Sequence, residues 1–243
     1  MKKLLITAIL IVFTLTSKSQ DHSKVFLGFG YNHVFSQELS TGIVLKYGTS
    51  YLVEARLKGS SSGVYIDWVK FYITEKLAID LTSNLAFFKH AILNAANLHY
   101  EASARLYTTS LILRYNFVNR TTQNKSTFNT YVGIGPAITK FKNLSSKIDE
   151  NFGPTVSTEV TYSNYVLGMA PKLGIEYITQ PQNWDRNWIL LSFDLRSCIA
   201  FSKQTIEDVK QIQNEFRAPS ILSKGRQVNP SSVAICFGVC FGF

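Results

Sequence analysis

Charged side chains that alternate with apolar ones are the part of this sequence that could do chemistry. In "NWILLSFDLRSCIAF", Asp194 and Arg196 alternate with Phe193 and Leu195. Alternate residues of a strand point to opposite faces, so such segments predict one apolar and one charged face. Collected over the chain, the charged face comprises Lys46, Glu54, Arg56, Asp67, Asp80, Arg114, Lys172, Glu176, Asp194 and Arg196.

This predicted charge network contains five acids and five bases. Carboxylates beside arginines could act as general acids or bases. A charge taken out of water costs several kcal/mol unless it is paired, so a self-neutralising filling of a narrow barrel explains the same residues. We favour the filling, and we predict no catalytic residues, no cofactor and no metal site.

The segment "HYEASAR" is the strongest alternative for catalysis. His99, Glu101 and Ser103 would share one face of a strand, as in a Ser–His–Glu hydrolase. A nucleophile and its base must approach within about 3 Å, whereas residues four apart on one strand are about 13 Å apart. Direct contact between His99 and Ser103 is therefore excluded.

Three cysteines, Cys198, Cys236 and Cys240, fall on the same face as the charges. Cys236 and Cys240 are too far apart along one strand to form a disulfide. A bridge between Cys198 and Cys236 is conceivable, and a role as small interior residues is the simpler interpretation. No Cys/His spacing is typical of a metal site.

The elements that must position these residues are strands. Period-two alternation recurs along nearly the whole chain, from "KVFLGFGYN" to the final "SSVAICFGVCFGF", which indicates an antiparallel all-β protein. Short connections that follow a tyrosine alternate with a second, longer class. The tyrosines are Tyr47, Tyr72, Tyr115 and Tyr177.

Short turns that alternate with longer loops, with aromatic residues at the edges, are typical of transmembrane β-barrels. Four turns predict a closed up-and-down barrel of ten strands, with the four tyrosines in a girdle at the short-turn end. Alternation continues unbroken from Ile43 to Leu57, so eight strands is the alternative. In "GVYIDWVKFY", Lys70 falls out of phase, which a β-bulge would explain.

Two orientations of the strands are compatible with this alternation. A soluble lipocalin-like barrel would place the apolar set inside and the charges outside. The charged face is too rich in Gly, Ala and Cys for a solvated exterior, and the apolar set is too large for a narrow interior. Lipid-facing charges near the midplane would cost about 2–4 kcal/mol. We therefore predict that the apolar face contacts lipid.

The first residues, "MKKLLITAILIVFTLTSKSQ", have a basic start and an apolar stretch from Leu4 to Leu15. This pattern predicts a cleaved signal peptide over residues 1–19 and a barrel domain over 20–243. Without Lys2, Lys3 and Lys18, 22 basic and 16 acidic residues remain. No basic run predicts nucleic-acid binding, and lipid headgroups are the simpler partner. Beyond the leader, no stretch of about 18 apolar residues predicts a spanning helix.

The last long connection contains "SKQTIEDVKQIQNEF". Ile206, Val209, Ile212 and Phe216 fall near helical spacing, which predicts a short amphipathic helix at the barrel mouth. Together with residues 143–160, the connection over residues 202–230 would form the surface available to an external or envelope protein partner.

The leader, "SLILRYNF" followed by "TYVGIGPAI", the "LGIEY" strand and the closing strand that ends on Phe243 together resemble the small outer-membrane β-barrels of Gram-negative bacteria, the porin-family or OmpA/OmpX-like barrels. The resemblance covers essentially the whole mature chain. It implies an outer-membrane location and contact with outer-membrane lipid. It also implies that Val239, Phe241 and Phe243 form the C-terminal signal read by the barrel-assembly machinery.

Fold alone does not fix activity. The function we expect is a non-enzymatic structural or interaction barrel, or a very narrow pore. The alternatives are an outer-membrane enzyme of the lipid A hydrolase or protease type, and a soluble lipocalin-like binding barrel.

Overall fold

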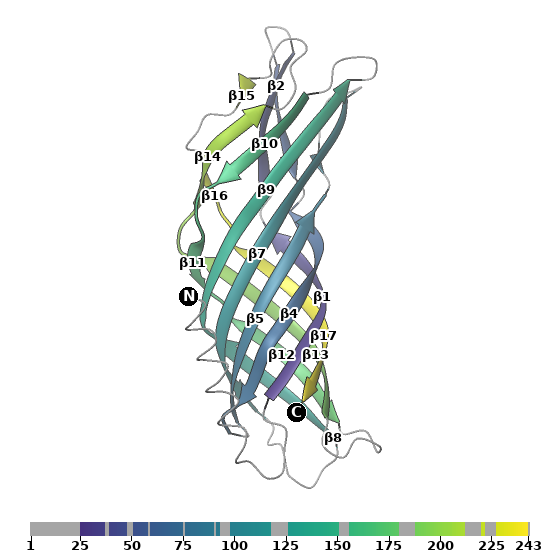
Figure 1. The fold of residues 1–243 in the computed structure, drawn as a ribbon, viewed down its shortest axis with the longest axis vertical. Coiled ribbons are helices and arrows are strands. Elements are labelled where there is room, and N and C mark those ends of the chain that lie inside the picture. The colour runs from purple at the N-terminus through teal and green to yellow at the C-terminus, as the bar shows by residue number, and fades with distance from the viewer. Residues whose placement is uncertain are drawn as a thin grey trace.

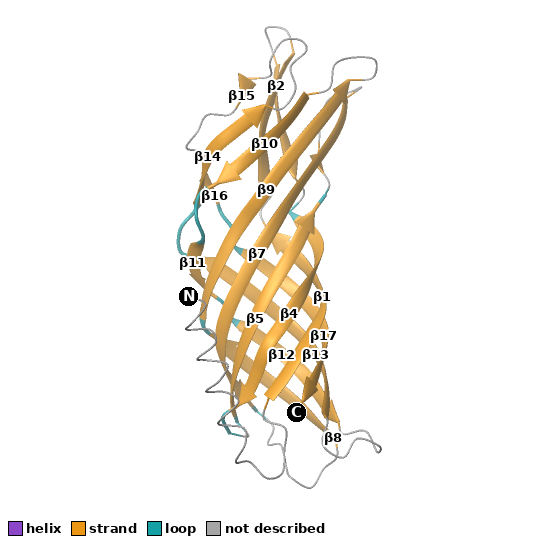
Figure 2. Ribbon diagram, viewed as in Figure 1, coloured by secondary structure: helices purple, strands orange, loops and turns teal. Residues whose placement is uncertain are grey.

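A computed structural model describes residues 25–36, 39–47, 51–57, 59–74, 76–89, 91–92, 98–117, 126–150, 156–179, 188–211, 220–221 and 227–242. These residues form strands and connections (Figure 2). Among them, no helix is long and apolar enough to cross a membrane.

An antiparallel ring with short turns at one end and longer connections at the other forms the body of the molecule (Figure 1). Within the described residues the ring contains eight strands, because several labelled strands continue one another in the same register. These eight are β1 (Val25–Ser36), β4 (Ser60–Tyr72), β5 (Leu77–Phe88), β7 (Leu98–Asn116), β8 (Ser126–Ile134) with β9 (Pro136–Glu150), β11 (Val166–Met169) with β12 (Lys172–Thr179), β13 (Trp188–Ala200) and β17 (Ser232–Gly242).

The last strand closes the ring on the first. β17 pairs with β1 from Phe26↔Gly242 to Ser36↔Ser232, and it pairs with β13 on its other side. Closure leaves no free sheet edge around the ring, so every strand has two neighbours. A closed sheet of this kind satisfies its backbone hydrogen bonds without water.

The ring thus has eight strands, the alternative to the predicted ten. The two strands counted in excess, β2 (Leu39–Tyr47) and β3 (Tyr51–Leu57), pair with each other. They belong to a second sheet with β6 (Ala91–Ile92) and β15 (Ser220–Ile221) at the loop end. β1 pairs directly with β4 instead, so the alternation from Ile43 to Leu57 belongs to a hairpin inserted between two ring strands.

Several strands continue past the ring toward the loop end. β9 runs to Glu150, and β10 (Val156–Tyr162) pairs with it. Of the predicted 143–160 connection, only residues 151–155 therefore lie between strands. β14 (Gln204–Gln211) pairs with β10 and with β16 (Gln227–Val228).

The predicted amphipathic helix is wrong for residues 204–211, which form β14, and residues 212–216 lie outside the described residues. The physical reason is visible in the strand itself. Ile206 is buried between an exposed Glu207 and a partly exposed Thr205, and the neighbouring β10 supplies the hydrogen bonds that a helix would have made internally.

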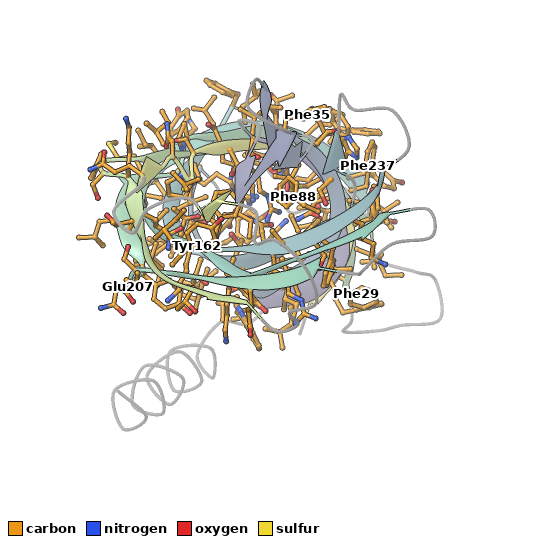
Figure 3. All side chains as sticks on the ribbon, turned by 90° about the horizontal axis from the view of Figure 1, so that it is seen from above. Phe29, Phe35, Phe88, Tyr162, Glu207 and Phe237 are labelled. Atoms are coloured by element: carbon orange, nitrogen blue, oxygen red, sulfur yellow. The ribbon has the colours of Figure 1, made fainter. Side chains whose placement is uncertain are left out.

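Large apolar side chains point away from the ring, as the predicted lipid-facing orientation requires. Phe29 is 61% exposed and Phe237 52%, and both lie outside the strand wall, whereas Phe88 points to the interior (Figure 3). The described ring strands therefore do not have the lipocalin-like arrangement, with the apolar face inside.

Candidate functional site

The interior of the ring holds seven of the ten residues of the predicted charge network. Each exposes no more than 4% of its surface, and together they come from five ring strands: Asp67, Asp80, Arg114, Lys172, Glu176, Asp194 and Arg196. Period-two alternation alone places them there, because each occupies an inward position of its strand.

One half of the network joins β4, β12 and β13. The Arg196 Nη2 atom lies 2.6 Å from Asp194 Oδ2 and 3.2 Å from Asp67 Oδ1. The Lys172 Nζ atom lies 3.7 Å from the same Asp194 oxygen. Asp194 therefore sits between two cations, and Arg196 sits between two carboxylates.

The other half joins β5, β7 and β12. Lys172 Nζ donates to Asp80 Oδ2 over 2.6 Å, and Arg114 Nη1 lies 3.7 Å from that oxygen. Arg114 donates two hydrogen bonds to Glu176, of 2.8 and 3.1 Å. The two halves meet at Lys172, so charges of alternating sign form one continuous chain across the interior.

Lys70 is an eighth member that the sequence prediction missed. Its Nζ atom lies 3.3 Å from Asp67 Oδ2, and both side chains are fully buried. A register shift between Asp67 and Val69 turns Lys70 inward. The available signal was the out-of-phase Lys70 and the bulge that it implied. With Lys70 included, four bases face four acids and the described chain of charges is neutral.

Two tyrosines cover the cations. The Tyr65 ring lies 4.1 Å from Arg196 Cζ, and the Tyr131 ring lies 4.3 Å from Arg114 Cζ. Such stacking stabilises a desolvated cation. Tyr65 fits because it lies over Gly30 and Gly238, which face each other in β1 and β17.

Apolar layers cover the charges at both ends. On the short-turn side lies a cluster of buried residues that includes Phe26, Ile178 and Trp188. On the loop side, Phe141 contacts Phe88 with 6.1 Å between ring centroids and Tyr162 with 6.2 Å. Figure 3 shows Phe88 and Tyr162 pointing to the inside of the ring.

A small cavity lies between the charges and the loop-side aromatic layer. Its volume is about 20 Å³, and its lining includes Arg196, Leu106, Thr108, Cys198 and Ala234. A space of this size holds about one water molecule. The cavity has polar partners for such a water, but it is too small for an organic ligand.

Lys46, Glu54 and Arg56 do not belong to the ring strands. They lie on β2 and β3 of the second sheet, where Val44 pairs with Glu54 and Ser40 with Arg56. Their side chains lie outside the described residues. The prediction that they lie in the barrel interior is wrong, because the backbone of the β2–β3 hairpin belongs to the second sheet and does not pair with the ring strands.

The predicted tyrosine girdle is only partly at the short-turn end. Tyr115 and Tyr177 face outward there, close to Phe117 and Phe128 respectively.

The prediction that Tyr72 and Tyr47 belong to that girdle is wrong. The bulge before Lys70 turns Tyr72 inward, and its hydroxyl donates to Glu176 Oε1. Tyr47 ends β2, in the second sheet at the loop end.

The predicted C-terminal signal and the cysteines lie at the closing strands of the ring. Val239 and Phe241 lie in β17 opposite Phe29 and Leu27, and Phe243 lies outside the described residues. All three cysteines are free and buried. Cys198 pairs with Ser232 in register, four positions from Cys236, so the conceivable disulfide is not formed.

The residues of the Ser–His–Glu alternative lie on β7 near the loop end. Ser103 is exposed on β7, and the side chains of His99 and Glu101 lie outside the described residues. The His33 ring packs on Phe35 with 4.8 Å between centroids. Among the described residues, no group of His, Cys, Asp and Glu could hold a metal ion.

No protein-family model matches the sequence, and no curated protein matches it closely. Among solved structures, the outer membrane protein OprG from Pseudomonas aeruginosa is similar over 92% of this chain and 99% of its own, with 18% identity and a TM-score of 0.52. The outer membrane protein AlkL is similar over 93% of both chains, with 14% identity and a TM-score of 0.46. Neisserial surface protein A is similar over 91% of this chain and 98% of its own, with 13% identity and a TM-score of 0.43. The chain thus has the fold of the small Gram-negative outer-membrane β-barrel proteins.

Proposed function

We propose that this protein is an integral outer-membrane barrel with a closed interior, which acts without enzymatic activity as a structural or interaction protein. The observation that carries the proposal is the neutral chain of eight buried charges, from Lys70 to Glu176, that crosses the interior between two apolar layers.

The number of ring strands supports a filled interior. An eight-stranded barrel is just wide enough for side chains to fill, whereas an aqueous channel of porin size needs about 16 strands. Opening a path through this interior would separate buried ion pairs, and removing one partner of such a pair costs about 3–5 kcal/mol. These energies favour a plug over a pore.

The loop end supports an interaction role. β9, β10 and β14 extend past the ring, and the second sheet lies beside them. With a signal peptide over residues 1–19 and Val239, Phe241 and Phe243 as the signal for the barrel-assembly machinery, this end would face the exterior. An external or envelope protein would then meet residues of the 143–160 and 202–230 segments.

The proposal is tested by conductance and by assay of the enzyme alternative. Purified full-length protein, checked for folding by heat-modifiable gel mobility, is inserted into planar bilayers and also incubated with lipid A and with peptide substrates. We expect no steady current and no product. A stable single-channel current would establish the narrow pore instead, and a deacylated or cleaved product that is lost in His99→Ala would establish the enzyme.

A further inference from the structure

The outer wall of the barrel changes from apolar to basic at one level on β7 and β9. Moving toward the loop end, the outward residues of β7 pass from Leu113 and Leu111, 53% and 49% exposed, through the partly exposed Thr109 and Tyr107 to Arg105. Those of β9 pass from Ile138 to Lys140 and Lys142. The two strands pair with each other along this stretch, so the three cations form one basic patch at the edge of the apolar band.

Two of the cations face each other directly. Arg105 pairs with Lys142 in register, and both side chains are exposed. Lys140 lies two positions nearer the apolar band, opposite Tyr107. Directly opposed residues of an antiparallel pair have Cβ atoms about 4.5–5.5 Å apart, and like charges placed so are destabilising.

The protein supplies no counter-charge for this patch within the described residues. No described carboxylate forms an ion pair with Arg105, Lys140 or Lys142. The cations lie against aromatic rings instead: Arg105 Cζ is 5.9 Å from the Phe87 centroid, and Lys140 Nζ is 5.4 Å from the Tyr165 centroid. The exposed Glu159, on β10, pairs with Ser145, farther toward the loop end.

We propose that the basic patch of Arg105, Lys140 and Lys142 binds the phosphate groups of lipid headgroups in the outer leaflet. The patch lies where the apolar band ends, which is the depth of the headgroups. A phosphate between Arg105 and Lys142 relieves their mutual repulsion and accepts charge-assisted hydrogen bonds from both. The buried charges neutralise one another, so the attraction for lipid phosphate comes from the three cations on the outer wall.

The two ends of the apolar band differ in a way that fits this orientation. The described outward residues at the short-turn edge of β7, β8 and β12 are uncharged, and they include the aromatics Tyr115, Phe128 and Tyr177. The proposal rests on the outer-membrane location and orientation proposed above. It adds the headgroup chemistry that the loop-end edge of the barrel recognises.

The test uses the full chain in phosphatidylcholine nanodiscs that contain either phosphorylated lipid A or the same lipid after enzymatic dephosphorylation. Lipid bound per protein is counted by mass spectrometry for the wild type and for Arg105→Gln/Lys142→Gln. The control Lys76→Gln/Lys203→Gln removes two exposed positive charges elsewhere on the molecule.

We expect the wild type and the control to enrich phosphorylated over dephosphorylated lipid A several-fold, and the patch variant to lose that preference. Equal enrichment of the two lipids by the wild type, or an equal loss in the control, would overturn the proposal.

Thermal unfolding midpoints supply a second measurement, in which the difference between the patch variant and the wild type should change with the lipid. In phosphatidylcholine alone, the patch variant should unfold at the same or a higher temperature than the wild type, because a repulsion has been removed. With phosphorylated lipid A, the wild type should unfold at the higher temperature. A variant that is less stable in both lipids contradicts the proposal.

Inorganic phosphate added without lipid A separates a headgroup site from a general anion site. If the phosphate alone raises the wild-type midpoint as much as lipid A does, the patch binds free anions and the headgroup proposal fails. No shift with inorganic phosphate, together with a shift with lipid A, supports it. The conductance and enzyme assays above do not depend on this result, so the two proposals fail separately.

Discussion

Arg114 on β7 and Glu176 on β12 form a bidentate ion pair inside the barrel, with N–O distances of 2.8 and 3.1 Å. β8 lies between their strands in the ring, so the pair spans a strand that neither residue belongs to. Asn129 on β8 donates to the same carboxylate over 3.2 Å. Three neighbouring strands are thereby tied together through one side chain.

Glu176→Gln should destabilise the barrel by about 3–5 kcal/mol, because it leaves the buried Arg114 without its closest counter-charge. Arg114→Met/Glu176→Met should recover much of the loss, since neither partner is then charged. The free energy of unfolding is measured by urea titration in lipid vesicles, with the fluorescence of the three tryptophans as the signal. Glu159→Gln, at an exposed position, should leave it unchanged; an equal effect there would contradict the account.

Gly238→Ala should destabilise the barrel by about 1–3 kcal/mol, the usual cost of overpacking. A Cβ at Gly238 would meet the Tyr65 hydroxyl. Tyr65→Phe removes that oxygen, so the cost of Gly238→Ala should be smaller in the Tyr65→Phe background. The same urea titration measures this double-mutant cycle, and strictly additive costs would show that the two residues do not touch.

Phe193→Arg should cost about 2–4 kcal/mol, whereas Phe117→Arg should cost about 0–1 kcal/mol, because the penalty for an outward charge falls from the bilayer midplane to the interface. Phe193 lies in the middle of β13 and packs on Phe237 with 4.7 Å between centroids. Phe117 follows the short-turn end of β7. Equal costs at the two sites would argue against the assigned depth.

Replacing residues 37–58 by a short Gly/Ser turn should leave the barrel folded. The Ser36 amide already donates to the Gly59 carbonyl over 2.6 Å, and Phe35 pairs with Ser60, so the ring is continuous without β2 and β3. Retained heat-modifiable mobility on gels is the expected result. Loss of the folded band would favour a ring that needs these strands, as the ten-strand prediction did.

Alternation predicted the closed barrel and the side of the wall that each ring strand presents to lipid. It did so because a lipid-facing strand must alternate at every position, so that residues such as Phe193 and Asp194 take opposite faces. The short turn after Tyr72 was likewise predicted, as one of the short connections that follow a tyrosine. In the structure the Ile73 and Thr74 amides donate hydrogen bonds to the Leu77 carbonyl.

The sequence predicts less where strict alternation breaks down. A β-bulge was predicted at Lys70 and is present, whereas the inward positions of Lys70 and Tyr72 that follow from it were not part of the predicted charge network and girdle. Alternation does not name a strand's partner, and the β2–β3 hairpin was therefore counted into the ring. In β14, Ile206 and Val209 are three residues apart, which fits a helix but not strict strand alternation. The pairing with β10 makes this segment a strand, with a register shift between the pairs Thr161–Asp208 and Tyr162–Ile206.

Labelling from within the bilayer tests the central claim, that the apolar faces meet hydrocarbon while the charges close the interior. The folded full-length protein in liposomes is irradiated with a carbene-generating probe dissolved in the lipid, and the modified residues are located by mass spectrometry. The account predicts label on Phe193 and Leu195 and none on Asp194 and Arg196. Label on Asp194 and Arg196 with Phe193 and Leu195 spared would mean that the wall is inverted.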